Sequence, residues 1–236
     1  MRNLSLATIG AASALATVAC FLVGIPFAVG SGVELLIPET DATLDWIADV
    51  DSAGGLFFVG AWLVVAGGFF GVVALVGFYD ALRDAGPVIV LGPILGAVGL
   101  TLVTISHVVP IAMAAELVPA YVAADAATKA SLAPTFELLS SLSLGLNTAG
   151  NMLGWGVVVP LYGFAILRTR VVPRWIGWLG IFVGVFAGWL GLLSLAWSPI
   201  EAVTFLGFIG FFLFMASLGV ALLRPGRLAA GQGSPG

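Results

Sequence analysis

The chain has 236 residues, of which 61% are hydrophobic and only 8% are charged, and its formal net charge is −4. Soluble globular proteins carry roughly 25% charged residues, so the composition excludes an ordinary soluble domain and predicts an integral membrane protein. The single cysteine excludes an internal disulfide. No basic cluster points to nucleic acid, and no nucleic-acid partner is expected.

Six apolar runs are long enough to cross a membrane, since a hydrocarbon core of about 30 Å needs about 20 apolar residues in a helix. Lipid cannot satisfy free backbone groups, and the alternation of a barrel strand is absent, so each run should be a helix. The predicted fold is all-α, a polytopic bundle of six transmembrane helices in one domain, residues 1–223, before a disordered cytoplasmic tail, residues 224–236. The runs cover residues 4–29, 55–78, 88–115, 138–166, 176–197 and 203–223.

The basic residues indicate how these helices are oriented. If the amino terminus is cytoplasmic, Lys129 is the one basic residue that falls outside, and the other seven fall inside. This distribution follows the positive-inside rule and predicts that both termini are cytoplasmic. The inner set consists of Arg2, Arg83, Arg168, Arg170, Arg174, Arg224 and Arg227.

An acidic segment follows the first apolar run. Within it, residues 40–50 are expected to form a short helix in which Asp41, Asp45 and Asp49 recur every four residues. Two interpretations are open, a cation site and the wet face of an interfacial helix, and the missing ligand pattern of a calcium loop favours the second. The residues expected to dip into the lipid headgroups are Leu44, Trp46, Ile47 and Val50.

The second outer segment covers residues 116–135. Pro134 and Thr135 predict the start of the fourth transmembrane helix, with Thr135 as its N-cap. Glu137 would then lie in the first turn, where the helix dipole favours a carboxylate and gives a sufficient structural reason for it.

Many of the 32 glycines are spaced by four residues. In lipid, small residues on one helix face permit the close contact on which dispersion depends, so these spacings predict a compact bundle. The run Gly180, Gly184 and Gly188 predicts that the fifth helix is tightly packed along one face. The spacings leave contacts within one chain and a homo-oligomer through glycine-rich helix faces equally open.

The one histidine, His107, lies in the third apolar run, and Asn147 lies in the fourth. Counted from the inner arginines at about 1.5 Å per residue, both should sit about 31 to 36 Å above the cytoplasmic side, at one level in the outer leaflet. Thr104 shares a helix face with His107, and Asn151 shares one with Asn147. The candidate polar network or ligand site, with two acids above the hydrocarbon, is Thr104, His107, Glu116, Glu137, Asn147 and Asn151.

Pro110 adds a local irregularity beside His107. Proline lacks an N–H, so it should leave the carbonyl of Ser106 without its helical donor and kink the third helix. A freed carbonyl, an imidazole and two amides are groups that line cavities in membrane proteins.

The sequence offers no partner residues with which His107 could bind a metal or activate a nucleophile. One histidine and one cysteine cannot form a zinc site or a pair of haem ligands, so no metal and no cofactor is expected. No G-x-S-x-G motif is present, and the adjacent side chains of Ser106 and His107 should diverge by about 100°. The residues favour a hydrogen-bond network of His107, Asn147 and Asn151, with a ligand or proton site as the alternative.

One stretch resembles a known family. NMLGWGVVVPLYGFAILRTRVVPRWIGWLGIFVGVFAGWLGLL, within residues 147–197, resembles the second half of a bacterial family of six-helix membrane proteins that is a domain of unknown function. The resemblance implies a fold and a bacterial plasma or inner membrane location, but no activity and no catalytic residues. The residues that carry it are Arg170, Pro173, Arg174, Trp175, Gly177, Trp178 and Gly180.

Three functions remain open at this stage. The favoured one is a non-enzymatic membrane protein that contacts membrane lipids and binds a lipid or small apolar ligand near the third and fourth helices. The second is a small transporter or proton-coupled carrier in which His107 titrates, with Glu116 and Glu137 at the mouth. The third is an intramembrane enzyme with His107 as base, for which no nucleophile is visible.

Overall fold

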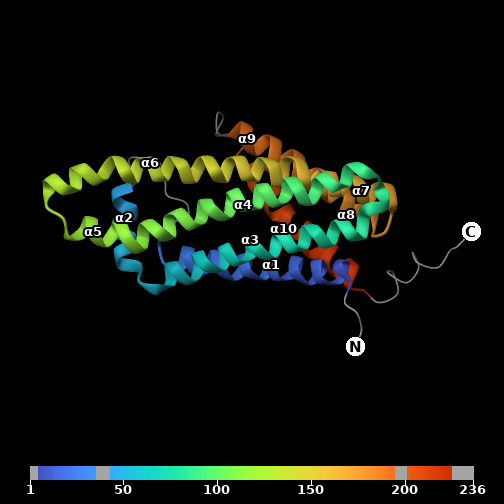
Figure 1. The fold of residues 1–236 in the computed structure, drawn as a ribbon, viewed down its shortest axis with the longest axis horizontal. Coiled ribbons are helices and arrows are strands. Elements are labelled where there is room, and N and C mark those ends of the chain that lie inside the picture. Colours follow the sequence, from blue (N-terminus) through green and yellow to red (C-terminus); the bar gives the residue numbers. More distant parts are fainter. Residues whose placement is uncertain (1–4, 36–42, 195–200, 225–236) are drawn as a thin grey trace, which may run out of the picture. The chain divides into compact units, whose positions relative to one another are not determined.

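A computed structural model describes residues 5–35, 43–194 and 201–224, and this part of the chain is helical without a β-strand (Figure 1). Its α-helices are α1 (Leu6–Gly30), α2 (Thr43–Ala53), α3 (Gly55–Leu82), α4 (Leu91–Ala112), α5 (Val118–Ala123), α6 (Ala126–Asn151), α7 (Val159–Thr169), α8 (Arg174–Val183), α9 (Leu190–Ser194) and α10 (Glu201–Leu223). Its π-helical turns are η4 (Met113–Leu117), η5 (Met152–Val158) and η6 (Gly184–Trp189), and its 3-10 turns are η2 (Arg83–Ala85) and η3 (Pro87–Val90). The predicted all-α class is confirmed.

Among the described residues, six helical stretches are long and apolar enough to cross a membrane, as the sequence predicted. The protein is therefore a multi-pass membrane protein. The stretches are Leu6–Gly30, Gly55–Ala85, Pro87–Ala123, Ala126–Thr169, Arg174–Leu193 and Phe205–Leu223. The predicted tail, apart from Arg224, and the end of the fifth predicted span lie outside the described residues.

The third and fourth helices are longer than predicted, and the expected start at Thr135 is wrong. Helix α6 begins at Ala126, and Asp125 caps it, because its Oδ1 accepts a hydrogen bond from the backbone N–H of Thr128 at 2.8 Å. Pro134 lies inside the helix. Since Pro134 is exposed, water can satisfy the carbonyl that it leaves without a donor, and the helix continues through it.

The chain forms two compact units. Unit 1 comprises residues 1–18, 69–100 and 151–236, and unit 2 comprises residues 19–68 and 101–150. Each unit has its own core of buried apolar side chains. A single domain that runs to residue 223 stays a prediction, and the two units are described separately below.

Unit 1 is held together by close backbone contacts at glycine. A Cβ on Gly163 of α7 would lie 2.6 Å from the carbonyl oxygen of Gly177 in α8, so neither position has room for a larger residue. Gly10 of α1 lies equally close to Gly77 of α3. Such contacts bring backbones together where lipid supplies no hydrophobic drive between helices.

The predicted close packing of the fifth helix is confirmed within the chain. A Cβ on Gly180 would lie 2.9 Å from the ring of Phe214, and one on Gly184 would lie 2.6 Å from the ring of Pro160. Gly188 lies directly against the backbone of Gly156. These contacts lie within unit 1, whereas a homo-oligomer through other glycine faces stays a prediction.

The core of unit 2 includes the short helix α2, whose predicted position is confirmed over its described residues. Three of the side chains expected to dip into the headgroups, Trp46, Ile47 and Val50, are instead buried in this core, and the side chain of Leu44 lies outside the described part of the structure. Trp46 packs edge-on against Phe57 at 6.2 Å between ring centroids. Burial of a large aromatic ring in protein keeps it in a dry contact that headgroups do not offer.

The acidic face of α2 points away from this core. Asp45 and Asp49 are exposed, and Asp41 lies outside the described residues. Among the described residues no group of three histidine, cysteine or acidic side chains lies close enough together to hold a metal ion.

Candidate functional site

The polar side chains that the structure buries are concentrated in unit 2. Of five such residues in the described part of the chain, Thr17 belongs to unit 1 and the other four belong to unit 2. Buried polar groups in a membrane protein are costly unless they are hydrogen-bonded. This cluster, which we call the serine–histidine cluster, consists of Ser106, His107, Ser140 and Ser143.

His107 is 8% exposed, and its ring is held from one side. Its Nδ1 lies 2.7 Å from the carbonyl oxygen of Val103, one turn earlier on α4. A carbonyl can only accept, so Nδ1 carries the proton and Nε2 of the neutral ring is an acceptor. No described residue donates a hydrogen bond to Nε2.

Ser106 lies closer to His107 than the sequence indicated. The two side chains do not diverge, because Ser106 Oγ donates to the same Val103 carbonyl at 2.6 Å and lies 3.3 Å from Nδ1 of the ring. The pair is nevertheless not a nucleophile with its base, because Nδ1 already holds a proton and the hydroxyl proton is directed at Val103. The geometry gives no support to serine catalysis.

The carbonyl of Ser106, which Pro110 leaves without its helical donor, accepts a hydrogen bond from a facing helix. Ser143 of α6 donates through its hydroxyl to the carbonyl oxygen of Ser106 at 2.7 Å. The predicted effect of Pro110 on α4 is therefore visible as a side-chain hydrogen bond between α4 and α6. This bond fixes the two helices in register at the level of His107.

The other predicted site residues differ in their contacts and in the unit to which they belong. Asn147 is half-buried, and its side chain makes no hydrogen bond within the described part of the chain. Thr104 is also half-buried and lies in direct contact with Gly68. Asn151 belongs to unit 1, so the network of His107 with both asparagines stays a prediction.

Both acidic residues of the predicted site are exposed. Glu116 lies in the π-turn η4, and Glu137 lies within α6 instead of in its first turn. Neither belongs to the serine–histidine cluster. A role for these two carboxylates at the mouth of a site stays a prediction.

Ser143 makes the contact with the His107 helix that the prediction assigned to Asn147. The sequence places Ser140, Ser143 and Asn147 on one polar face of the fourth helix that can meet the face of His107, but the predicted network used the asparagines. The available signal was Pro110, since a carbonyl without its helical donor requires a new one from a facing helix. A short hydroxyl side chain approaches a packed backbone more easily than an amide does.

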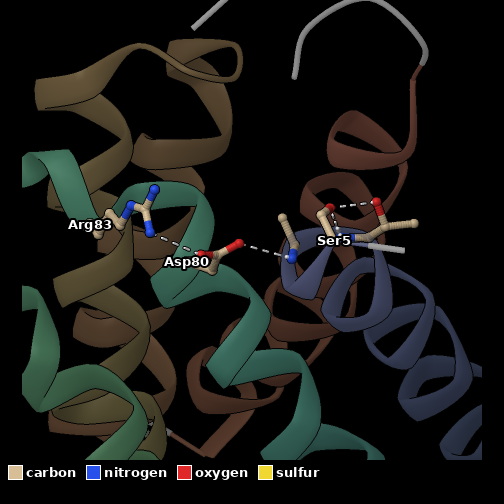
Figure 2. A network of polar contacts seen from close by, with 5 residues as sticks. Ser5, Asp80 and Arg83 are labelled. Atoms are coloured by element: carbon tan, nitrogen blue, oxygen red, sulfur yellow. Dashed lines mark hydrogen bonds and ion pairs between the residues drawn. The ribbon is translucent and has the colours of Figure 1, made fainter. Parts of the chain in front are cut away.

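A second polar group lies in unit 1, where the end of α3 meets the start of α1 (Figure 2). Asp80 accepts a hydrogen bond from the backbone N–H of Ala7 at 3.3 Å and another from Arg83 at 3.4 Å. Ser5 caps the same helix, because its Oγ accepts from the N–H of Thr8. A carboxylate at a helix amino terminus is favoured by the dipole, so this group ties α1 to α3 and needs no ligand.

Within the described residues, six helical stretches that are long and apolar enough to cross a membrane define a polytopic membrane protein. The chain belongs to the family described as a domain of unknown function, DUF4386, which matches residues 9–226. The resemblance drawn from residues 147–197 falls within that match, so the predicted kind of family is confirmed. The comparisons with curated proteins and with solved structures gave no match.

Proposed function

We propose that this protein is a non-enzymatic binding protein of the membrane, which holds a lipid or small apolar ligand beside α4 and α6 and contacts it through His107. The observation that carries the proposal is the ring of His107, which is 8% exposed and has Nε2 without a partner among the described residues. A buried acceptor without a donor costs about 1 to 3 kcal/mol. A ligand with one donor group would remove that cost.

The surroundings of the ring favour a neutral ligand. The other members of the serine–histidine cluster are uncharged, and Glu116 and Glu137 are exposed. An ionic headgroup would lack a counter-charge there, whereas a hydroxyl on an apolar body supplies the donor for Nε2. We therefore infer a ligand class of apolar molecules that carry one hydroxyl or amide N–H.

Native mass spectrometry of the gently extracted protein tests this proposal. The wild-type chain should retain about one small molecule, and His107→Ala should reduce retention on the order of tenfold because one hydrogen bond of about 1 to 2 kcal/mol is lost. Ser143→Ala is the matched control, since it removes a helix contact and leaves Nε2 in place. If the wild-type chain retains no small molecule and His107→Ala lowers the unfolding temperature, the ring of His107 serves only the fold.

A proton-coupled carrier is the second candidate, and one observation favours it. Pro110 and the π-turn η4 interrupt the third helix within ten residues of His107, and broken helices line the substrate sites of many transporters. Proteoliposomes would distinguish the two functions. A carrier would show uptake that depends on pH and vanishes in His107→Ala, whereas a binding protein would show retention without uptake.

We also propose that both termini face the cytoplasm of a bacterial cell and that the membrane is the plasma or inner membrane. Support comes from the arginines, seven of which fall on one side in this orientation. A cysteine introduced as Ser234→Cys in a Cys20→Ala chain should resist an impermeant thiol reagent in intact cells. Labelling of this cysteine in intact cells would show that the carboxyl terminus lies outside, contrary to the proposed orientation.

A further inference from the structure

The turn between α7 and α8 in unit 1 carries a basic surface without counter-charges. Arg168, Arg170 and Arg174 are all exposed. No ion pair joins any of them to a carboxylate of the described chain, in which the recorded pair is Arg83 with Asp80. The exposed rings of Trp175 and Trp178 lie directly after them on α8.

Local structure explains only one of these arginines. Arg168 lies in the last turn of α7, where the helix dipole favours a cation. Arg170 has φ 56°, the left-handed conformation that favours glycine, and it is the one non-glycine residue of the described chain with positive φ. Arg174 opens α8, where the dipole disfavours a cation. Arg170 is therefore placed against a preference of backbone conformation, and Arg174 against a preference of charge.

The backbone that presents these side chains is held firmly. The N–H of Arg170 donates to the carbonyl oxygen of Ile166 at 2.9 Å, and the side chain of Val172 is 3% exposed. On either side, α7 and α8 approach as closely as Gly163 and Gly177 allow. The turn is thus a rigid support, and the guanidinium groups are the parts free to bind.

We propose that this turn, residues 168–178, is a docking surface for the phosphate groups of anionic phospholipids. Guanidinium groups bind phosphate oxygens in a bidentate manner, and each basic residue near an anionic leaflet contributes about a fivefold preference. The indole rings of Trp175 and Trp178 suit the headgroup level of a bilayer. The surface lies in unit 1 and is independent of the ligand proposed for His107.

Nanodiscs of phosphatidylcholine mixed with phosphatidylglycerol provide the test. After gentle detergent extraction, the ratio of the two lipids retained by the protein is measured by native mass spectrometry. The wild-type chain should be enriched in phosphatidylglycerol, and the triple variant Arg168→Gln, Arg170→Gln, Arg174→Gln should lose that enrichment at least tenfold. Unchanged enrichment in the triple variant would overturn the proposal.

Two single variants separate a docking surface from diffuse attraction and from misfolding. Arg224→Gln removes an exposed arginine elsewhere in unit 1, so it should lower the enrichment less than Arg170→Gln does. Arg170→Gly removes the guanidinium and relieves the left-handed backbone, so enrichment should fall while the unfolding temperature in phosphatidylcholine is maintained or raised. Equal losses in Arg224→Gln and Arg170→Gln would contradict a specific surface.

Discussion

Units 1 and 2 use the same kinds of helix contact but bury different side chains. Unit 1 brings backbones together at Gly163 with Gly177, as unit 2 does at Gly24 with Gly60, and in its largely apolar and aromatic core the Tyr162 hydroxyl donates to the carbonyl oxygen of Leu75 at 2.7 Å. Unit 2 buries Ser106, His107 and Ser143 and joins two helices by a hydroxyl-to-carbonyl hydrogen bond. Dense apolar contact gives stability without chemical function, whereas the polar interior offers a group that can bind. The difference explains why we place the ligand in unit 2.

The largest expected effect is an overpacking substitution in unit 1. Gly163→Ala would place a methyl group 2.6 Å from the carbonyl oxygen of Gly177. This oxygen belongs to the backbone of a packed helix, so it cannot rotate away as a side chain could. We expect a loss of about 2 to 3 kcal/mol in the free energy of unfolding. Reversible unfolding in mixed micelles measures it.

The control for this substitution is a glycine of unit 2 in the same kind of structure. Gly145 lies inside α6, and a Cβ there would meet nothing within 4 Å. Gly145→Ala should be neutral or stabilise by about 0.5 to 1 kcal/mol through helix propensity. Equal losses at both positions would show that the glycine contacts of unit 1 are not the source of its stability.

The second prediction concerns the hydrogen bond of unit 2. Ser143→Ala leaves the carbonyl of Ser106 without a donor, because Pro110 has no N–H to offer. We expect a loss of about 1 to 2 kcal/mol, while Ser141→Ala on the exposed face of the same helix should change little.

A double variant sharpens this test. Pro110→Ala restores a backbone N–H four residues after Ser106, so Ser143→Ala should cost less in that background than in the wild-type chain. A cost that is the same in both backgrounds would mean that the serine stabilises unit 2 by some other contact.

The third prediction concerns the polar group of unit 1. Asp80→Ala removes an acceptor from the amino-terminal turn of α1 and a partner from Arg83 (Figure 2). The side chain of Asp80 is 26% exposed, so we expect a loss of only about 1 kcal/mol. Asp84→Ala, at an exposed neighbouring position, serves as the control. Comparable losses from the two variants would exclude a specific role for Asp80.

The smallest effect is expected at the exposed cap of α6 in unit 2. The backbone N–H of Thr128 lowers the pKa of Asp125 below its usual value. The stabilisation is therefore complete above the unfolded-state pKa of about 4 and is lost as the pH falls through the lower, folded-state pKa. The protection factor of the Thr128 amide against exchange should fall over that range, and Asp125→Ala should abolish this dependence on pH.

The elements that could be predicted from sequence were those governed by a single dominant force. The six membrane-crossing stretches follow from the exclusion of water by lipid, and the close face at Gly180, Gly184 and Gly188 follows from the need for small residues. The carbonyl freed by Pro110 was also predictable. Each of these requires only the residue type and its spacing.

The errors arose where two local signals competed. Pro134 with Thr135 predicts a helix start, whereas the helix begins at Ala126 with Asp125 as its cap and continues through the exposed Pro134. From the sequence, Trp46 suits a membrane interface and a protein core equally well. In the structure its ring packs against Phe57 in the core of unit 2. For the candidate site, the sequence identified His107 and the polar face of the fourth helix that carries Ser143, but not which side chain of that face makes the bond, because the register between α4 and α6 is a tertiary property.

The length of the third and fourth helices has a practical consequence. The stretches Pro87–Ala123 and Ala126–Thr169 contain 37 and 44 residues, or about 55 and 66 Å of helix, against a hydrocarbon core of about 30 Å. Each stretch is therefore longer than the hydrocarbon core is thick, so we expect the short link between them to lie beyond it. An antibody fragment raised against that link would add mass outside the detergent belt and give electron microscopy an alignment marker for a particle otherwise too small to orient.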